Sequence, residues 1–191
     1  MERITLTQVA RLVKSEWILL LLGVISLSIF ALTVFSFTKA KPQETPQGIV
    51  WQKKIVAGKS TTEDIKATLG TPTKTQEEQG GISYFYPTAN QYRLNEIEFR
   101  DNTVSIIKEQ VIGNEKEALN DYLQKYGQPE AKLFGQHGTF ALGHFWGQKG
   151  LLVFASASDG TIVEIWYFVP TSLGNFLANN PGLKKEEPKS F

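Results

Sequence analysis

The sequence predicts an α+β fold: two tandem helix–βββ repeats form an antiparallel sheet with the helices on one face, preceded by one transmembrane helix. Three observations predict this fold. A short helical phrase that ends in Gly-x-Pro occurs twice, at residues 61–72 and 117–130. Each copy is followed by three segments typical of strands. An uncharged apolar run, Trp17–Thr38, precedes both copies.

The apolar run lies between Glu16 and Lys39 and carries no charged side chain. An α-helix needs about 20 apolar residues to cross a hydrocarbon core of roughly 30 Å. A helix buried in a soluble protein typically carries a polar stripe, and a cleaved signal peptide has a shorter apolar region followed by small residues. The run 17–38 is therefore expected to be a permanent anchor that contacts the lipid bilayer.

The flanking segments suggest an orientation. Three basic residues and the free amine precede the apolar run, whereas two basic residues follow it closely. Positive charge favours the cytoplasmic side, so residues 1–16 are expected in the cytoplasm and the rest of the chain outside it. Residues 39–50, rich in Pro and Gln, are expected to form a tether. Residues 176–191 are expected to form a disordered tail.

Residues 51–113 are expected to form the first repeat. Ser60, Thr61 and Thr62 are the candidate caps of its helix, and Glu63 lies three residues after Ser60, a spacing that can satisfy two backbone amides. The helix is expected to end at Gly70 with a positive φ. The three strands are expected at residues 82–87, 93–100 and 103–111, the last two joined by a tight turn at Asp101-Asn102.

Residues 114–175 are expected to form the second repeat. Its helix is expected to be capped by Asn114 and to end at Gly127 in the same way. Because this helix has the broader apolar face, Tyr122→Ala is expected to destabilise the protein more than Ile65→Ala. Its strands are expected at residues 139–146, 150–156 and 161–169.

The two repeats are expected to share one core. A chain of about 60 residues buries too little surface to be stable without a disulfide, a metal or a partner. The sequence has no cysteine and no credible cluster of metal ligands. Each repeat must therefore obtain the missing core from the other, and the favoured arrangement joins their sheets edge to edge.

Part of the first repeat resembles a known family. The segment VAGKSTTEDIKATLGTPTK (residues 56–74), followed by NEIEFRDNTVSII (residues 95–107), resembles the domain of the SmpA/OmlA-type outer-membrane assembly lipoproteins. The tandem arrangement is similar to the secreted β-lactamase inhibitory proteins, in which two such units form one curved sheet. This resemblance implies a structural motif and no catalytic one. Those lipoproteins carry a lipidated cysteine, whereas this chain has a predicted transmembrane helix instead.

Composition argues against several functions. The net charge of +1 gives no indication of a nucleic-acid partner, and the absence of cysteine excludes thiolate nucleophiles and cysteine-based metal sites. His137 and His144 are the only histidines, and metal sites need three or four ligands. No serine–histidine–acid motif is present either. The chain is therefore expected to have no catalytic residues, no metal and no cofactor.

Aromatic side chains provide the candidate binding site. In the last strands both faces are apolar, which allows two interpretations. Either the sheet has a core on both sides, closed in part by residues 173–180, or one face exposes an aromatic patch that docks a partner. The residues chosen for the patch are Tyr84, Tyr86, His144, Trp146, Trp166 and Phe168.

The expected function is that of a single-pass, membrane-anchored, non-catalytic domain outside the cytoplasm. It is expected to bind a protein or peptide as an envelope scaffold or assembly accessory protein. Two alternatives stay open. One is an inhibitor that clamps an enzyme on the concave sheet face, and the other is an accessory domain that binds cell wall or lipid.

Overall fold

The computed structural model describes residues 48–52, 54–78, 80–113 and 118–185. These residues belong to one compact unit, Pro46–Phe191. The predicted cytoplasmic segment, the predicted anchor Trp17–Thr38 and most of the predicted tether lie outside the described residues. No helix in the described part of the chain is long and apolar enough to span a membrane.

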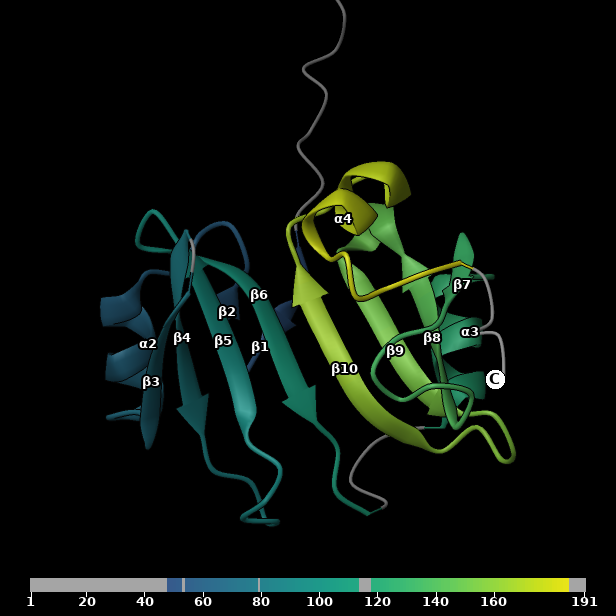
Figure 1. Cartoon of the computed structure of the whole chain (residues 1–191), viewed down its shortest axis with the longest axis horizontal. Helices are drawn as coiled ribbons and strands as arrows, with labels where there is room; N and C mark the ends of the chain where they lie inside the picture. Colours follow the sequence, from purple (N-terminus) through teal and green to yellow (C-terminus); the bar gives the residue numbers. More distant parts are fainter. Residues whose placement is uncertain (1–47, 53, 79, 114–117, 186–191) are drawn as a thin grey trace, which may run out of the picture. The chain divides into compact units, whose positions relative to one another are not determined.

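One antiparallel sheet of eight strands forms the centre of the unit, in the order β3-β4-β5-β6-β10-β9-β8-β7 (Figure 1). The two repeats join edge to edge through β6 and β10, whose paired residues run from Ile106 with Phe168 to Gln110 with Glu164. The α+β class and the continuous sheet are therefore confirmed. The strands are β3 (Lys74–Glu78), β4 (Gly81–Tyr86), β5 (Asn95–Arg100), β6 (Thr103–Gln110), β7 (Ala131–Leu133), β8 (Ala141–Trp146), β9 (Leu151–Ser156) and β10 (Ile162–Phe168).

Each repeat contributes four strands to this sheet, and the prediction of three was wrong. The additional strands are β3 and β7, which form the two edges. The sequence of β3, KTQEE, is polar throughout, as suits an exposed edge that must not pair with other chains, and β7 has only three residues. Neither segment shows the apolar alternation by which the other six strands were predicted. A separate hairpin, β1 (Val50–Trp51) and β2 (Ile55–Val56), begins within the predicted tether.

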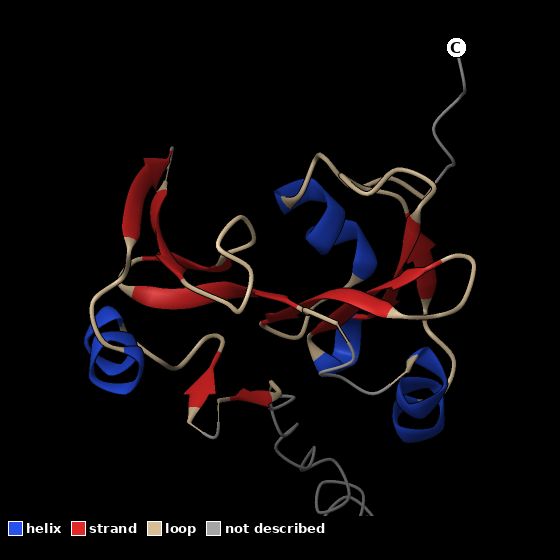
Figure 2. Ribbon diagram, turned by 90° about the horizontal axis from the view of Figure 1, so that it is seen from below, coloured by secondary structure: helices blue, strands red, loops and turns tan. Residues whose placement is uncertain are grey.

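Three α-helices cover the described part of the sheet. α2 (Thr62–Leu69) and α3 (Leu119–Tyr126) lie on one face, whereas α4 (Leu173–Asn179) lies on the other (Figure 2). The prediction of helices on one face holds for the two repeat helices only. The predicted tail is also corrected, because Phe176 of α4 and Leu183 beyond it are buried, and residues 186–191 lie outside the described residues.

The structure selects Thr61 from the three candidate caps of α2. The Asp64 backbone N–H donates to the Thr61 hydroxyl at 3.3 Å, and the Thr61 N–H donates to the Asp64 carboxylate at 2.9 Å. The Ser60 hydroxyl instead accepts from the Val56 N–H. At α3 the Asp121 carboxylate accepts from the N–H of Ala118 at 3.0 Å. The predicted cap Asn114 lies outside the described residues.

The predicted helix ends are confirmed. Gly70 has φ 82° and ψ −160°, and Gly127 has φ 78° and ψ −166°. Their N–H groups donate to the carbonyls of Lys66 and Leu123, each at 2.9 Å. This combination of φ and ψ is a region that essentially only glycine occupies. Asp101 and Asn102 also have positive φ, 49° and 60°, as the predicted two-residue hairpin turn requires.

Replacing Gly70 or Gly127 by Ala is expected to destabilise the protein by about 1–3 kcal/mol, the range for a side chain forced into such a conformation. A Cβ at either position meets nothing within 4 Å, so the loss arises from the backbone and not from a clash. Urea unfolding of the folded unit measures the change. Gly182→Ala is the matched control, because that glycine has open space and no positive φ; a loss as large in the control would contradict the explanation.

Two hydrophobic cores fill the space on either side of the sheet. The first lies under α2 and α3 and contains residues of both repeats, among them Ile65, Ile107 and Ile165. The second lies under α4 and contains Phe145 and Phe154. The interpretation of a two-sided core is therefore confirmed.

The predicted order of the two helix substitutions is reversed by this packing. Ile65 is 0% exposed, whereas α3 has no fully buried residue and Tyr122 lies at the margin of the first core. We therefore expect Ile65→Ala to lower the free energy of unfolding by about 2–5 kcal/mol. This loss is expected to exceed that of Tyr122→Ala, because only the Ile65 substitution leaves an enclosed cavity. Parallel urea titrations give both values, and a larger loss for Tyr122→Ala would contradict this assignment.

Candidate functional site

The six aromatic and histidine residues chosen from the sequence do not form one surface. All are buried, and they belong to two different faces of the sheet. The α2/α3 side holds Tyr84, Tyr86, His144 and Trp146, and the α4 side holds Trp166 and Phe168. The open aromatic face, one of the two interpretations of the sequence, is therefore absent from the described residues, because α2 and α3 cover one side of the sheet and α4 covers the other side of the second repeat.

Two of these aromatic residues form hydrogen bonds with the C-terminal ends of the repeat helices. The Tyr86 hydroxyl donates to the carbonyl of Gly70 at 3.2 Å, and the Trp146 indole N–H donates to the carbonyl of Gly127 at 2.9 Å. Tyr86 ends β4 and Trp146 ends β8, which occupy the same place in the two repeats. Burial, followed by the neighbouring Tyr84, raises the pKa of Tyr86, which keeps its hydroxyl a donor. These side chains support the fold and do not face a partner.

On the α4 side of the first repeat, the Lys108 ammonium contacts two carboxylates. It lies 3.1 Å from Glu96 and also pairs with Glu98, and it stands 5.0 Å from the ring centre of Trp166. Burial acts to lower the pKa of Lys108, but Glu98 and Glu96 outweigh it and raise the pKa. The lysine is therefore held in its charged form, and both glutamates are already paired.

A second polar cluster is centred on Glu164, which is 1% exposed. Its carboxylate accepts from the Trp166 indole N–H at 2.8 Å and the Gln136 amide at 3.0 Å, and it pairs with His137. Burial acts to raise the pKa of Glu164, but these hydrogen bonds outweigh it and lower the pKa. The contact between His137 and Glu164 therefore holds the loop that carries His137 against the sheet. Within the described residues there is no group of three metal-ligating side chains.

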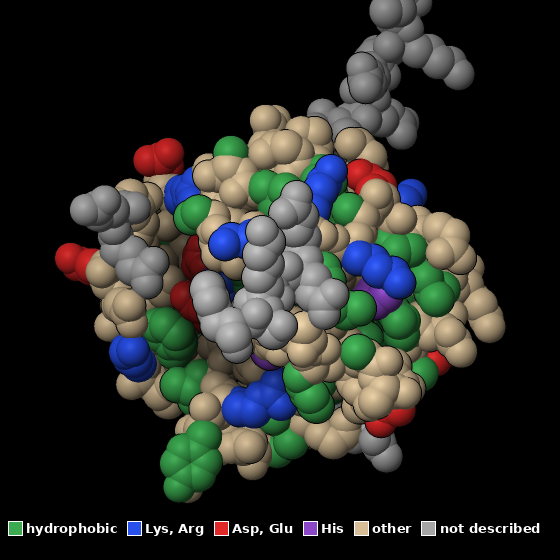
Figure 3. Space-filling model, turned by 45° about the vertical axis from the view of Figure 1, so that its right-hand side comes forward, with side chains coloured by type: hydrophobic (Ala, Val, Ile, Leu, Met, Phe, Trp, Pro, Cys, Tyr) green, Lys and Arg blue, Asp and Glu red, His purple; other side chains and the backbone are tan. Residues whose placement is uncertain are grey.

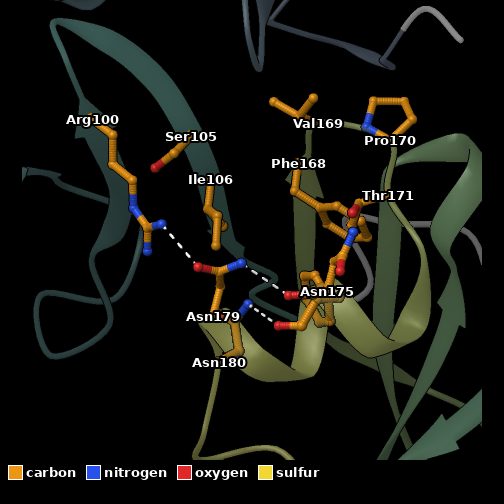
Figure 4. A pocket seen from close by; sticks show the side chains of 11 residues that line it. Arg100, Ser105, Ile106, Phe168, Val169, Pro170, Thr171, Asn175, Asn179 and Asn180 are labelled. Atoms are coloured by element: carbon orange, nitrogen blue, oxygen red, sulfur yellow. Dashed lines mark hydrogen bonds between the residues drawn. The ribbon is translucent and has the colours of Figure 1, made fainter.

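A pocket of about 240 Å³ opens where the two repeats meet (Figure 4). We call it the seam pocket, because Ile106 of β6 and Phe168 of β10, which pair across the junction, both line it. The first repeat contributes two further residues, and the segment through α4 contributes the rest. Its lining residues are Arg100, Ser105, Ile106, Phe168, Val169, Pro170, Thr171, Asn175, Phe176, Asn179 and Asn180.

The floor of the seam pocket is apolar and its rim is polar. Ile106, Phe168 and Phe176 are buried and belong to the second core. At the rim, the Arg100 guanidinium reaches from the end of β5 toward α4 and donates to the Asn179 side-chain oxygen at 3.2 Å (Figure 4). An apolar floor with a few polar groups around it is typical of binding pockets.

Sequence reasoning found only Phe168 of this pocket. The others could not be recognised, because the pocket depends on β6 pairing with β10 and on α4 returning across that junction. The one available signal is Arg100, a cation at the end of an otherwise alternating strand. A charged residue at the end of a strand is most often simply exposed to solvent. Arg100 alone therefore could not indicate a pocket from the sequence.

A second hollow of about 470 Å³ lies beside α2. Its lining residues come from one short stretch of the first repeat, residues 54–68, and include Lys54, Lys59 and Asp64. It lacks the buried aromatic floor of the seam pocket.

The surface around these features mixes charges of both signs. On the face seen in Figure 3, the Lys and Arg side chains of the described residues are dispersed among acidic, hydrophobic and uncharged ones. A surface for nucleic acid would instead gather basic side chains into a patch or stripe.

Comparisons with known proteins give two structural likenesses. No family model and no curated protein matches this chain. A DUF4309 family protein, YjgB, from Bacillus subtilis has a TM-score of 0.44 and 15% identity, covering 64% of this chain and 88% of that protein. An extracellular protein containing an SCP domain from Bacillus anthracis has a TM-score of 0.41 and 13% identity, covering 80% of this chain and 55% of that protein. Likenesses this distant assign no function to the chain.

Proposed function

We propose that this chain is a membrane-anchored, non-catalytic binding domain that holds a protein or peptide partner outside the cytoplasm. In this proposal residues 17–38 form the anchor and the seam pocket receives the partner. The observation that carries the proposal is the pocket itself: an apolar floor with a polar rim, built jointly by both repeats.

The size of the seam pocket supports a macromolecular partner. Pockets that bury a whole drug-sized ligand occupy about 300–1,000 Å³, whereas this pocket has about 240 Å³. That volume suits one anchoring side chain of a partner whose remaining contacts are made on the surrounding surface. Single buried anchors of this kind commonly dominate the energy of a protein interface.

The inhibitor alternative is less well supported. An enzyme clamped on the sheet would need an open, rigid face. On the second repeat α4 covers the strands (Figure 2), and on the first repeat the ion pairs of Lys108 already satisfy Glu96 and Glu98. Desolvating such pairs is costly. The proposal is therefore a scaffold that captures a partner segment at one pocket.

Photo-crosslinking tests the proposed site. A photoreactive residue replaces Asn175, on the pocket rim, in the full chain expressed in its native cells; the matched control replaces Gln124, which is exposed on α3 on the opposite face. We expect a covalent adduct of defined mass from position 175 that is several-fold weaker or missing from position 124. Equal adducts from both positions, or none from position 175, would reject the seam pocket as the partner site.

Membrane extraction tests the proposed anchor. Because the run from Trp17 to Thr38 is uncharged and long enough to span a bilayer, the full chain is expected to stay in membranes through alkaline carbonate washing, whereas residues 46–191 alone are expected in the soluble fraction. Protease added outside intact cells is expected to remove the C-terminal unit. Release of the full chain by carbonate would reject the anchor, and cleavage only after lysis would reverse the orientation.

A further inference from the structure

We infer that the seam pocket captures the C-terminal residue of a partner peptide, with an apolar last side chain on the pocket floor and its terminal carboxylate on Arg100. This inference rests on the proposed function and names the chemistry that the pocket would recognise. It is carried by the charge of Arg100, by the pairing of the carboxylates around it and by the apolar floor.

Arg100 has hydrogen-bonding capacity to spare. A guanidinium carries five N–H donors, and the bond that the structure shows for this side chain goes to the Asn179 amide oxygen. Within the described residues Arg100 forms no ion pair. The planar guanidinium binds a carboxylate through two parallel hydrogen bonds, which makes it the side chain best suited to this anion.

The acidic residues of the same strand face do not neutralise Arg100. Glu98 and Glu96 alternate with buried residues along β5 and point to the same side as Arg100. Both carboxylates are engaged by Lys108. One ammonium offsets one of the two negative charges, and within the described residues neither carboxylate pairs with Arg100, so the guanidinium at the pocket rim keeps donors for a ligand.

The apolar floor of the seam pocket determines the kind of side chain that the last residue of the ligand carries. Ile106, Phe168 and Phe176 provide a buried apolar surface directly below the rim. A terminal residue places its side chain and its carboxylate on the same Cα, so one residue can fill the floor and reach the rim. An internal aspartate or glutamate would place its carboxylate where the apolar side chain belongs. Capture of a terminal carboxylate is an established mode of peptide recognition.

Fluorescence anisotropy with defined peptides tests the inference. The full chain, in detergent or nanodiscs, is titrated into labelled hexapeptide pools of otherwise random sequence that end in Leu, Phe, Ser or Lys. Each pool is used as the free acid and as the C-terminal amide. We expect the Leu or Phe free acids to bind at least about 10-fold more tightly than their amides, because amidation removes the charge-assisted bonds to Arg100. The Ser and Lys pools are expected to bind more weakly.

Matched variants assign the effect to the pocket. Arg100→Gln is expected to lower binding of the free acids to the level of the amides, and Arg100→Lys to retain part of the difference. Asn175→Trp, which adds a large side chain at the rim, is expected to weaken both forms. Lys125→Gln, an exposed cation on α3, is the control and is expected to change nothing. All three positions are exposed, so unchanged unfolding curves verify that each of the four variants folds.

Three results would overturn the inference: no pool binds, acids and amides bind equally, or Arg100→Gln leaves the difference intact. Amidated peptides with an internal aspartate that bind as well as the free acids would also overturn it, because the carboxylate would then come from a side chain. Crosslinked adducts at position 175 together with any of these results would leave the proposed function standing. Missing adducts would reject the proposed function itself.

Discussion

Residues 46–113 and 114–191, expressed as separate chains, are expected to be poorly folded, whereas residues 46–191 are expected to unfold in one cooperative transition. The expected effect is the whole stability of the unit, commonly about 5–15 kcal/mol. The physical reason is that the junction between the repeats is part of the core and not a contact between two finished domains.

Several contacts at the junction cross from one repeat to the other. β6 pairs with β10 along the seam, and the Tyr167 hydroxyl donates to the buried Glu109 carboxylate at 2.8 Å. Burial, followed by Glu109, raises the pKa of Tyr167, so the hydroxyl stays a donor. The Arg93 guanidinium of the first repeat donates to the Val163 carbonyl of the second at 2.6 Å. Cutting the chain leaves each of these buried or half-buried groups without its partner, which costs about 1–3 kcal/mol of folding free energy for a fully buried group.

Nuclear magnetic resonance and thermal unfolding distinguish the outcomes. We expect narrow amide dispersion from either fragment alone and a native-like spectrum from residues 46–191. Mixing the two fragments is expected to restore part of that spectrum, because the β6–β10 pairing and the shared core can form between chains. Two independent transitions in residues 46–191, or a well-dispersed spectrum from one fragment, would contradict a shared core.

The elements that the sequence predicted correctly share a strong local signal. β4, β5, β6, β8, β9 and β10 alternate or are continuously apolar, and Gly70 and Gly127 stop their helices through a backbone conformation open to glycine. The repeat itself then predicted the edge-to-edge sheet, because neither half could complete a core alone. The resemblance to the SmpA/OmlA-type lipoproteins stays a prediction.

The elements that were missed depend on long-range contacts. β3 is polar throughout and β7 has only three residues, so neither segment carries an apolar alternation long enough to predict a strand. α4 was assigned partly to a disordered tail because its seven residues include two asparagines and a glycine. Its stability comes from Phe176, which packs on Phe145, Trp166 and Phe168. The seam pocket exists only after these contacts have formed, and the sequence could not place it.

The cluster around Glu164 leads to the second large effect. Glu164→Ala is expected to destabilise the protein by about 3–5 kcal/mol, the range for removing one partner from a buried charged network. The substitution leaves the Trp166 indole N–H, the Gln136 amide and the His137 ring without their common acceptor. Glu164→Gln keeps an acceptor for Trp166 but no charge, so its loss is expected to be smaller.

The same cluster predicts how stability depends on pH. The pKa of Glu164 is lower in the folded protein than its ordinary value of 4.5, so the unfolded chain binds a proton at a higher pH than the folded one does. The contribution of Glu164 is therefore complete above this ordinary pKa and is lost as the pH falls through the lower, folded-state pKa. Glu63 and Asp159 also have lowered pKa values, mainly through backbone hydrogen bonds, but both are present in wild type and variant alike and cancel in the comparison.

Urea unfolding of wild type and Glu164→Gln from pH 7 to pH 3 measures this dependence. The difference between their free energies of unfolding is expected to narrow as the pH falls. A difference that stays constant over this range would mean that the Glu164 carboxylate contributes no charge-dependent stability, and that its hydrogen bonds alone hold the 134–140 loop against the sheet.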